Sequence, residues 1–232
     1  MSCIRCKLSN NFVLGKNKNS TRYFMTTLLK STCQNAMDYE AYKALVHDLV
    51  QHKETTGADT SEEKVALTKL NASRLRRLDK TISIPEVAVE HFRNITTPQT
   101  WILIVESWCA DAVQTIPVIH KIAEISSKVN FKMVLRDEND ALMNHFLTNG
   151  ARAIPKLLIM DEACKVYDTW GPRSKNATQL VMDYKKEHGR IDDEFKKNLQ
   201  LWYLKDGGAA IIEDLVNKTM ATTSEEGIIS AI

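Results

Sequence analysis

The sequence lacks any apolar run long enough to cross a membrane. Uncharged apolar segments such as Trp101–Val105 and Leu157–Met160 fall far short of the roughly 20 residues that a membrane helix needs. It also lacks an excess of one charge, because 31 Lys and Arg residues nearly balance 29 Asp and Glu residues. No basic stripe with interleaved aromatic residues is present either. We therefore expect neither a membrane nor a nucleic acid as a partner.

Cysteine is also scarce. Positions 3, 6, 33, 109 and 164 give an odd number of cysteines in a chain of 232 residues, which is long enough to bury a substantial core without a disulfide framework. A reducing compartment fits best, so we expect a cytoplasmic protein. Cys3 and Cys6 form a C-x-x-C pair, but no second pair with zinc-ligand spacing follows. We expect no metal site and no other cofactor.

Acidic residues are absent from the first 37 residues, which contain six Lys and Arg together with many Ser, Thr and Asn. This composition is typical of an organellar transit peptide, of a disordered leader, or of an upstream start codon wrongly chosen, with Met25 and Met37 as the other candidate starts. An organelle therefore stays open as the alternative compartment. We predict that residues 1–37 form a basic, disordered leader.

From residue 38 the pattern changes. Residues 38–79 carry apolar side chains at helical spacing, which predicts an N-terminal extension of two helices, the second capped by Asp59 or Thr60. Residues 80–190 then alternate strands with helices in the order strand, helix, strand, helix, hairpin, helix. This order predicts an α/β domain with a mixed central sheet and helices on both faces. Further helices are expected over 191–220, and a loose tail over 221–232. The expected strands are 101–105, 131–135, 156–160 and 165–170, and the expected helices within the domain are 110–128, 138–147 and 175–188.

The junction between the first strand and its helix, Glu-Ser-Trp-Cys-Ala-Asp-Ala at 106–112, carries the candidate chemistry. Cys109 falls in the first turn of the helix, where unpaired backbone N–H groups and the helix dipole favour the nucleophilic thiolate. Asp111 suits a helix N-terminus but opposes a thiolate beside it, so its net effect has no predictable sign. Cys109 is the candidate catalytic residue, and Ala110, Asp111 and Ala112 complete the helix N-terminus. A structural, buried cysteine is the alternative.

These residues resemble the thioredoxin family. Trp108-Cys109 is similar to the Trp-Cys that opens the family's W-C-x-x-C motif, and Pro117 takes the place of the proline in the active-site helix. Ile154-Pro155 sits where the family has its cis-proline, and Gly171 matches the glycine after the last strand. The resemblance covers about half of the chain and looks closest to bacterial members with a C-x-D-A motif. It implies a thioredoxin-like fold with N-terminal and C-terminal helical extensions.

Two departures limit what the resemblance implies. Ala112 stands where the family has its second, resolving cysteine, and Leu103 stands where many members bury an Asp beneath the motif. Cys164 is expected at the far end of a strand from the active site, and Cys33 is expected in the leader. We therefore expect none of the other cysteines to resolve a disulfide at Cys109.

The resemblance implies a monothiol thiol-disulfide oxidoreductase. Cys109 would attack a disulfide of a protein or a low-molecular-weight thiol, and an external thiol would release the product. Trp108 would shape the site, while Ile154 and Pro155 would bind the substrate backbone. Two alternatives stay open: a redox-inactive protein- or peptide-binding module, favoured by the missing resolving cysteine and by Leu103, and a redox or peroxide sensor. The oligomeric state also stays open.

Overall fold

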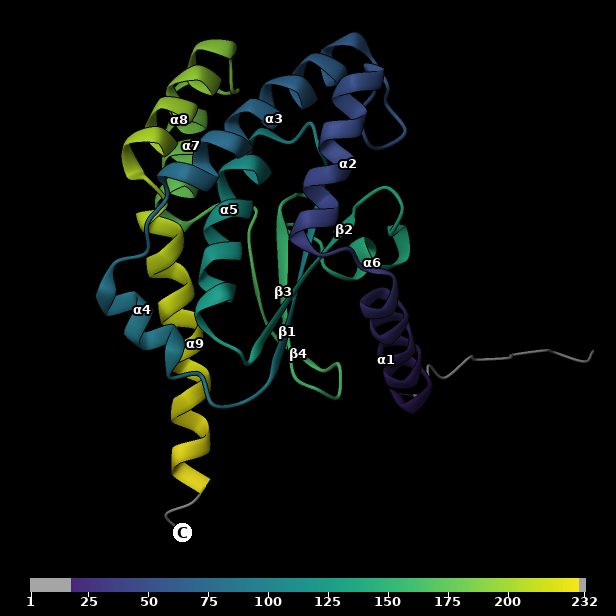
Figure 1. The fold of residues 1–232 in the computed structure, drawn as a ribbon, viewed down its shortest axis with the longest axis vertical. Helices are drawn as coiled ribbons and strands as arrows, with labels where there is room; N and C mark the ends of the chain where they lie inside the picture. Colours follow the sequence, from purple (N-terminus) through teal and green to yellow (C-terminus); the bar gives the residue numbers. More distant parts are fainter. Residues whose placement is uncertain (1–17, 230–232) are drawn as a thin grey trace, which may run out of the picture.

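The structure, a computed structural model, describes residues 18–229, with side chains described for residues 23–219. A small sheet lies at the centre of the molecule and helices flank it (Figure 1). In chain order the elements are α1 Lys18–Asn35, α2 Tyr39–His52, α3 Glu62–Thr81, α4 Glu86–Arg93, β1 Gln99–Val105, α5 Ala110–Ile125, β2 Val129–Leu135, α6 Asp140–His145, β3 Lys156–Met160, β4 Val166–Trp170, α7 Lys175–His188, α8 Asp193–Asp206 and α9 Ala209–Ile229.

The sheet has the strand order β2-β1-β3-β4. β1 runs parallel to β2 and antiparallel to β3, and β3 runs antiparallel to β4. The apolar run Trp101–Val105 forms most of β1 and is completely buried, as expected for a strand covered on both faces. The predicted mixed sheet with flanking helices, and terminal helices beyond it, is confirmed.

Helix α5 connects β1 to β2 and forms the centre of the helical packing. It contacts β2 on one side and α3, α4 and α9 on others, and Figure 1 shows it running beside the sheet with α9 and α4 next to it. Residues 111–119 are buried without interruption. A helix that is buried on every side must be covered by other elements all round, so the extensions before β1 and after β4 complete the core.

The strand register brings several loops to one edge of the sheet. Ile104 near the end of β1 lies opposite Lys156 at the start of β3, and Leu157 lies opposite Trp170 at the end of β4. The chain leaving β1 toward Cys109, the chain entering β3 through Pro155, and the chain leaving β4 therefore meet there. The β3–β4 turn, with Cys164, lies at the opposite edge, as predicted.

The predicted disordered leader is wrong for its second half. Residues 18–35 form α1, in which Leu29 is only 1% exposed. Met37 then pairs with Met133 of β2 through two backbone hydrogen bonds, of 3.0 and 2.8 Å. Composition did not reveal this segment because a few widely spaced apolar residues hold it against partners far along the chain. Residues 1–17 of the predicted leader lie outside the described residues.

Two helix boundaries also differ from the predictions. Helix α3 begins at Glu62 rather than directly after Asp59 or Thr60, because the Asp59 carboxylate accepts a hydrogen bond from the N–H of Ser61 (3.0 Å) in the loop before it. Helix α9 continues to Ile229, through most of the predicted loose tail. Residues 230–232 of that tail lie outside the described residues.

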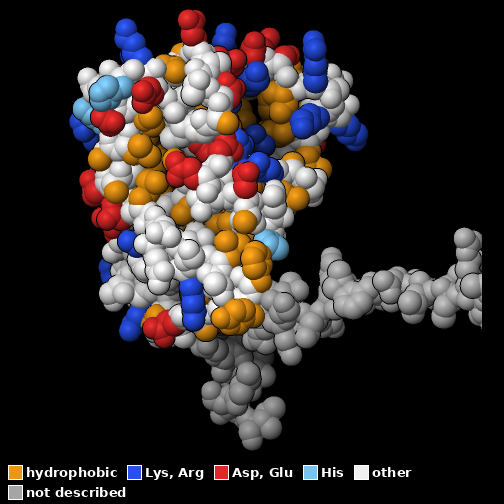
Figure 2. All heavy atoms as spheres, turned by 90° about the vertical axis from the view of Figure 1, so that its right-hand side faces the viewer, with side chains coloured by type: hydrophobic (Ala, Val, Ile, Leu, Met, Phe, Trp, Pro, Cys, Tyr) orange, Lys and Arg blue, Asp and Glu red, His pale blue; other side chains and the backbone are white. Residues whose placement is uncertain are grey.

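No helix within residues 18–229 is both long enough and apolar enough to cross a membrane. Figure 2 shows the face that includes α1. Acidic, basic and hydrophobic side chains are all present over the described part of this face. Tyr23 and Phe24 of α1 are among the exposed large hydrophobic residues of the chain.

Candidate functional site

Cys109 is the N-cap of α5 and follows the end of β1 after Glu106, Ser107 and Trp108. Its Sγ accepts a hydrogen bond from the backbone N–H of Ala112 (3.4 Å) and donates one to the carbonyl oxygen of Ile154 (3.5 Å). The Ile154–Pro155 peptide bond is cis. Cys109 is only 8% exposed, so the thiol lies between the helix N-terminus and the chain that enters β3, largely removed from water.

The pKa of the Cys109 thiol is raised to about 12, first by burial and second by the negative charge of Asp111. The backbone N–H groups of Ala112 and Asp111 and the charge of Arg173 act in the opposite direction but are outweighed. The helix N-terminus thus favours the thiolate, as expected, but its effect is smaller than that of burial and the Asp111 charge. Removal of water destabilises the thiolate more than the helix N-terminus and the Arg173 charge stabilise it.

Asp111 is held on both sides by residues from the C-terminal part of the chain. Its Oδ2 forms an ion pair of 2.5 Å with Arg173, in the loop after β4, and its Oδ1 accepts a hydrogen bond from the hydroxyl of Tyr203 on α8 (3.0 Å). Asp111 and Tyr203 are both buried. Helix α8 thus lies against the first turn of α5, and Asp111 attaches the two helices through its hydrogen bond to Tyr203.

Trp108 is attached to the N-terminal part of the chain. Its Nε1 donates a hydrogen bond to the carbonyl oxygen of Thr56 (3.1 Å). The ammonium group of Lys64 on α3 lies 3.1 Å from the ring centroid, and the guanidinium group of Arg136 lies 5.1 Å from it. Cations at such distances are attracted by the ring quadrupole. The half-buried ring is thus fixed by three contacts rather than standing free at the surface.

Ser107 joins the same region through a buried hydroxyl cluster. Its Oγ contacts the hydroxyls of Thr55, Thr56 and Thr68 at 3.3, 3.1 and 2.8 Å. Its N–H donates to Thr56 Oγ1 (2.8 Å), and its carbonyl accepts from the Asn71 side chain (2.9 Å). The α2–α3 loop and α3 therefore form one hydrogen-bonded unit with the motif. Sequence reasoning missed this role of Ser107, since single hydroxyl residues have no signature.

Glu106 is a second residue that the sequence analysis missed. Its side chain is completely buried, and its Oε1 accepts a hydrogen bond from the N–H of Asp137 (2.9 Å). Burial raises the pKa of this carboxyl. Leu103 lies in the same strand and is also completely buried. A buried carboxyl is thus present close to the motif, at the end of the strand rather than at position 103.

The remaining predicted site residues occupy ordinary positions in α5. Ala110 is the first residue of the helix and is half-buried, and Ala112 is completely buried in the first turn. Cys33 and Cys164 are not among the groups that shift the pKa of Cys109, whereas Cys164 is one of the groups that raise the pKa of Cys33. Cys3 and Cys6 lie outside the described residues. Among the described residues, no group of His, Cys, Asp or Glu could hold a metal ion.

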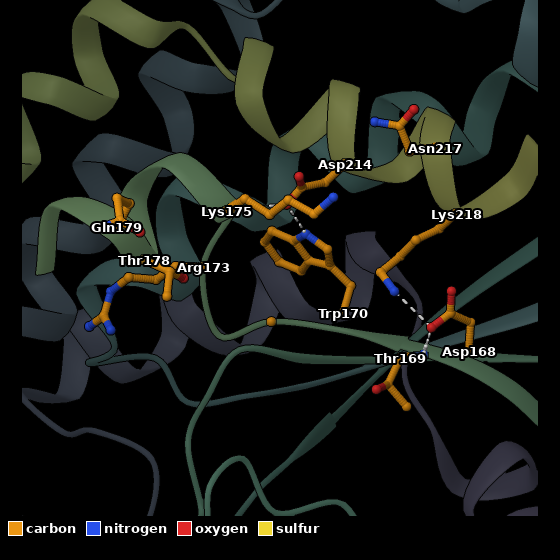
Figure 3. Close-up of a pocket in the computed structure, with 11 residues that line it drawn as sticks. Asp168, Thr169, Trp170, Arg173, Lys175, Thr178, Gln179, Asp214, Asn217 and Lys218 are labelled. Carbon is orange, nitrogen blue, oxygen red and sulfur yellow. Dashed lines mark hydrogen bonds and ion pairs between the residues drawn. The ribbon is translucent and has the colours of Figure 1, made fainter. Parts of the chain in front are cut away.

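A pocket of about 560 Å³ lies beside β4, α7 and α9, and Arg173 links it to the Cys109 site (Figure 3). Its charges are partly paired. Asp168 forms an ion pair with Lys218 (2.7 Å), and Asp214 accepts from the Trp170 indole (2.9 Å). Figure 3 shows Arg173 apart from these pairs at one end of the pocket. The Arg173 guanidinium therefore belongs both to this pocket and to the surroundings of the thiol.

Gly171 explains how the loops at this edge fit together. Its φ of +111° lies in a region that L-residues rarely adopt, and a Cβ there would come within 2.2 Å of the Pro155 carbonyl oxygen. Only glycine lets the chain leaving β4 approach the chain entering β3 this closely.

A mixed four-stranded sheet, a Trp-Cys pair at the start of the crossover helix and a cis-proline facing it define a thioredoxin-like protein. The family model described as thioredoxin matches residues 57–186, more than half of the chain. The chain therefore belongs to the thioredoxin family.

Two solved structures are similar to this chain. One is an HIV epitope-scaffold with 17% identity, covering 82% of this chain and 94% of its own, with a TM-score of 0.50. The other is a protein of unknown function from Pseudomonas aeruginosa with 16% identity, covering 77% of this chain and 93% of its own, with a TM-score of 0.43. The first supports the fold alone. No curated protein matches the sequence.

Proposed function

We propose that this protein carries out thiol-disulfide exchange through Cys109 alone. The observation that carries the proposal is the placement of the Cys109 sulfur, which accepts the N–H of Ala112 at the start of α5 and contacts the carbonyl of Ile154. A helix N-terminus stabilises the anionic sulfur that forms in exchange. The carbonyl of Ile154, which the Cys109 thiol occupies in the resting protein, is the group that an extended substrate would bind.

The exchange needs one enzyme sulfur and no cofactor. The Cys109 thiolate attacks one sulfur of a substrate disulfide, an enzyme–substrate disulfide forms, and the second substrate sulfur leaves as a thiolate. An external thiolate then attacks the substrate sulfur of this mixed disulfide and releases Cys109 as the thiolate. Ala112, at the place of a resolving cysteine, cannot perform the second step, so the external thiol is required.

The raised pKa of Cys109 makes this exchange dependent on the substrate. In the resting protein the thiol proton is bound to sulfur and donated to the Ile154 carbonyl. A backbone N–H of an extended substrate that binds this carbonyl competes with the thiol for the same acceptor. Substrate binding and loss of the thiol proton therefore favour each other. The half-buried Trp108 precedes the sulfur in the chain, the buried Pro155 follows the carbonyl that the sulfur contacts, and the charges of Asp111 and Arg173 act on the thiol.

The proposed partners are proteins or low-molecular-weight thiols and disulfides, with neither nucleic acid nor membrane involved, in the cytoplasm or, as the alternative, in an organelle. A redox-inactive peptide-binding module is the second candidate. The observation that favours it is the burial of Cys109, which keeps the thiol protonated at neutral pH.

The test uses a chain in which Cys3, Cys6, Cys33 and Cys164 are replaced by Ser, so that Cys109 is the single thiol. A small aromatic disulfide is added from about pH 7 to about pH 10, below the folded-state pKa, and the released thiolate is measured. We expect one thiolate per chain, a rate that rises throughout this range, a mixed disulfide at Cys109 in the mass spectrum, and its removal by an added external thiol.

The control is the same chain with Cys109→Ser, which should release nothing. If the folded chain forms no mixed disulfide over the whole range while the chain in denaturant reacts fully, exchange through Cys109 is excluded. The peptide-binding module then becomes the better description of the protein.

A further inference from the structure

The pocket of Figure 3 is enclosed by three elements, each of which presents polar side chains to it. Strand β4 forms one wall, and α7 and α9 form the other two. The residues that the helices contribute are spaced three and four apart, so each set shares one side of its helix. They are Lys175, Thr178 and Gln179 of α7 and Asp214, Asn217 and Lys218 of α9. Segments from different parts of the chain thus form one polar cavity.

The most buried lining residues, Trp170 and Asp214, form the floor of the pocket. The carboxylate of Asp214 accepts hydrogen bonds from the Trp170 indole (2.9 Å) and from the backbone N–H of Lys175 (3.0 Å). These two contacts join α9 to the end of β4 and to the start of α7. The three walls are therefore tied together at the base of the cavity, which is a fixed part of the fold.

The charged groups of the pocket differ in whether they already have partners. Asp168 forms an ion pair with Lys218 (2.7 Å), and Arg173 forms one with Asp111 (2.5 Å), which lies outside the lining. Lys175 is exposed, and within the described part of the chain its ammonium group forms no ion pair and no hydrogen bond. Lys175 is therefore the cation to which an anionic ligand can bind without first breaking an ion pair.

The uncharged part of the lining is also polar. Apart from Trp170 and Gly171, every described lining residue carries a charged group, a hydroxyl or an amide. Hydroxyls and amides, such as those of Thr178 and Asn217, both donate and accept hydrogen bonds. A hydroxyl group of a ligand does the same, whereas an apolar ligand would leave these side chains without partners. The lining therefore favours a ligand that carries several hydroxyl groups.

We propose that this pocket binds a small polyhydroxy monocarboxylate, the chemical class of the sugar acids, with its carboxylate on Lys175 and its hydroxyls on the polar walls. A single carboxylate fits better than two, because Asp168 and Asp214 also line the pocket and repel a second negative group. The cavity of about 560 Å³ lies within the range of roughly 300–1,000 Å³ that is typical of small-molecule sites.

Arg173 connects this pocket to Cys109. It lines the pocket and forms an ion pair with Asp111, two residues after Cys109. The positive charge of Arg173 lowers the pKa of the Cys109 thiol. A carboxylate bound in the pocket has the opposite charge, so it opposes this effect and leaves a smaller fraction of Cys109 as the thiolate. Binding of the acid therefore reduces the reactivity of Cys109.

Calorimetry with sodium gluconate, a polyhydroxy monocarboxylate, tests the binding site in the full chain at constant ionic strength. Sorbitol, which has the hydroxyls without the carboxylate, and sodium acetate, which has the carboxylate without the hydroxyls, are the comparison ligands. We expect saturable binding of one gluconate per chain. Each comparison ligand should bind more weakly by about tenfold or more, because it lacks one of the two kinds of contact.

The matched variants are Lys175→Gln and Lys186→Gln. Both remove a positive charge from an exposed position on α7, but only Lys175 lines the pocket. We expect Lys175→Gln to weaken gluconate binding by about tenfold and Lys186→Gln to leave it unchanged. Equal affinities of the two variants, equal binding of all three ligands, or no saturable binding of gluconate to the folded chain would overturn the proposal.

Alkylation of the chain with Cys109 as its single thiol tests the connection through Arg173. At a fixed pH, saturating gluconate should slow the alkylation by about twofold or more, whereas sodium chloride at the same concentration should not. The measurement needs no disulfide exchange, so its result is independent of the function proposed for Cys109. A rate that bound gluconate leaves unchanged or accelerates would overturn this connection.

Discussion

The cysteines at the two edges of the central sheet differ in their burial and in the groups around them. At one edge Cys109 is buried among charged and polar groups, with Asp111, Arg173 and the N–H of Ala112 around a single sulfur. At the other edge Cys33 and Cys164 are half-buried, and Cys164 is one of the groups that raise the pKa of Cys33. The pKa is raised at both edges, to about 12 for Cys109 and about 11 for Cys33. Placement at a helix N-terminus therefore does not by itself make a cysteine acidic, because exclusion of water is the larger effect.

The two edges also differ in the segments of the chain that pack over them. The Cys109 edge is covered by residues from the N-terminal extension, such as Thr56 and Lys64, and by Tyr203 from the C-terminal helices. The Cys164 edge is held by a single short turn and the end of α1. Substitutions that loosen the Cys109 edge should therefore change stability and Cys109 reactivity together.

Gly171→Ala should produce the largest effect. The new Cβ would lie 2.2 Å from the Pro155 carbonyl oxygen, at a backbone φ of +111°, so the chains beside Cys109 must move apart. We expect a loss of roughly 3 kcal/mol or more in the free energy of unfolding, measured in urea.

The matched control for this substitution is Gly150→Ala. Gly150 also has a positive φ, of +77°, but a Cβ there would meet no atom within 4 Å. It should cost only about 1 kcal/mol, from backbone strain alone. Equal losses at the two positions would show that the close approach at Pro155 contributes nothing.

Ser107→Ala comes next in size. It removes a hydroxyl that contacts three threonine hydroxyls in a buried cluster, and these lose a partner without gaining water. We expect a loss of about 1–3 kcal/mol in the free energy of unfolding, measured in urea. Ser73→Ala, at an exposed position on α3, is the control and should change it by less than about 0.5 kcal/mol. A loss no greater than that of Ser73→Ala would contradict the cluster's role.

Much of the fold could be predicted from the sequence, because local signals mark its elements. The strand Lys156–Met160 and the helix Lys175–His188 were predicted with the bounds that the structure shows. The first is a continuous apolar run, and the second ends at a glycine, Gly189, with a positive φ. Helix α1 was missed because its attachment depends on Met37 pairing with Met133, a contact across 96 residues that leaves no periodic signal.

The candidate site was only partly predictable for the same reason. The Trp-Cys pair and Ile154-Pro155 lie in short motifs, so their positions could be inferred from the resemblance. The groups that set the state of the thiol come from distant segments: Tyr203 reaches Asp111 across 92 residues, and Thr56 reaches Trp108 across 52. The sign of the pKa shift at Cys109 depends on how completely these segments exclude water, which no local pattern encodes.

Asp111→Asn tests how much the charged groups beside Cys109, as distinct from its burial, contribute to its raised pKa. The Asp111 charge raises the pKa of Cys109 and the Arg173 charge lowers it, so removing the carboxylate lowers the pKa twice, directly and by leaving Arg173 unpaired. In the chain with Cys109 as its single thiol, we expect alkylation at a fixed pH to accelerate about tenfold for each unit by which the pKa falls. Asp193→Asn on the exposed start of α8 is the control, with no change in rate. A slower reaction in Asp111→Asn would mean that its other contacts outweigh its charge.

Lys64→Met should have the smallest effect and tests whether the cation over Trp108 contributes to the cover of the Cys109 edge. Methionine keeps most of the apolar stem and removes the ammonium group, which lies 3.1 Å from the ring centroid. A cation over an aromatic ring contributes about 0.5–1 kcal/mol at an exposed site, and Trp108 keeps its hydrogen bond to Thr56 and its contact with Arg136. We therefore expect a loss of about 0.5 kcal/mol in the free energy of unfolding, together with faster alkylation of Cys109. Lys69→Met on the exposed face of the same helix should change neither quantity. If the two variants behave alike, the Thr56 hydrogen bond and Arg136 are sufficient to hold the ring, and the burial of Cys109 does not depend on the charge of α3.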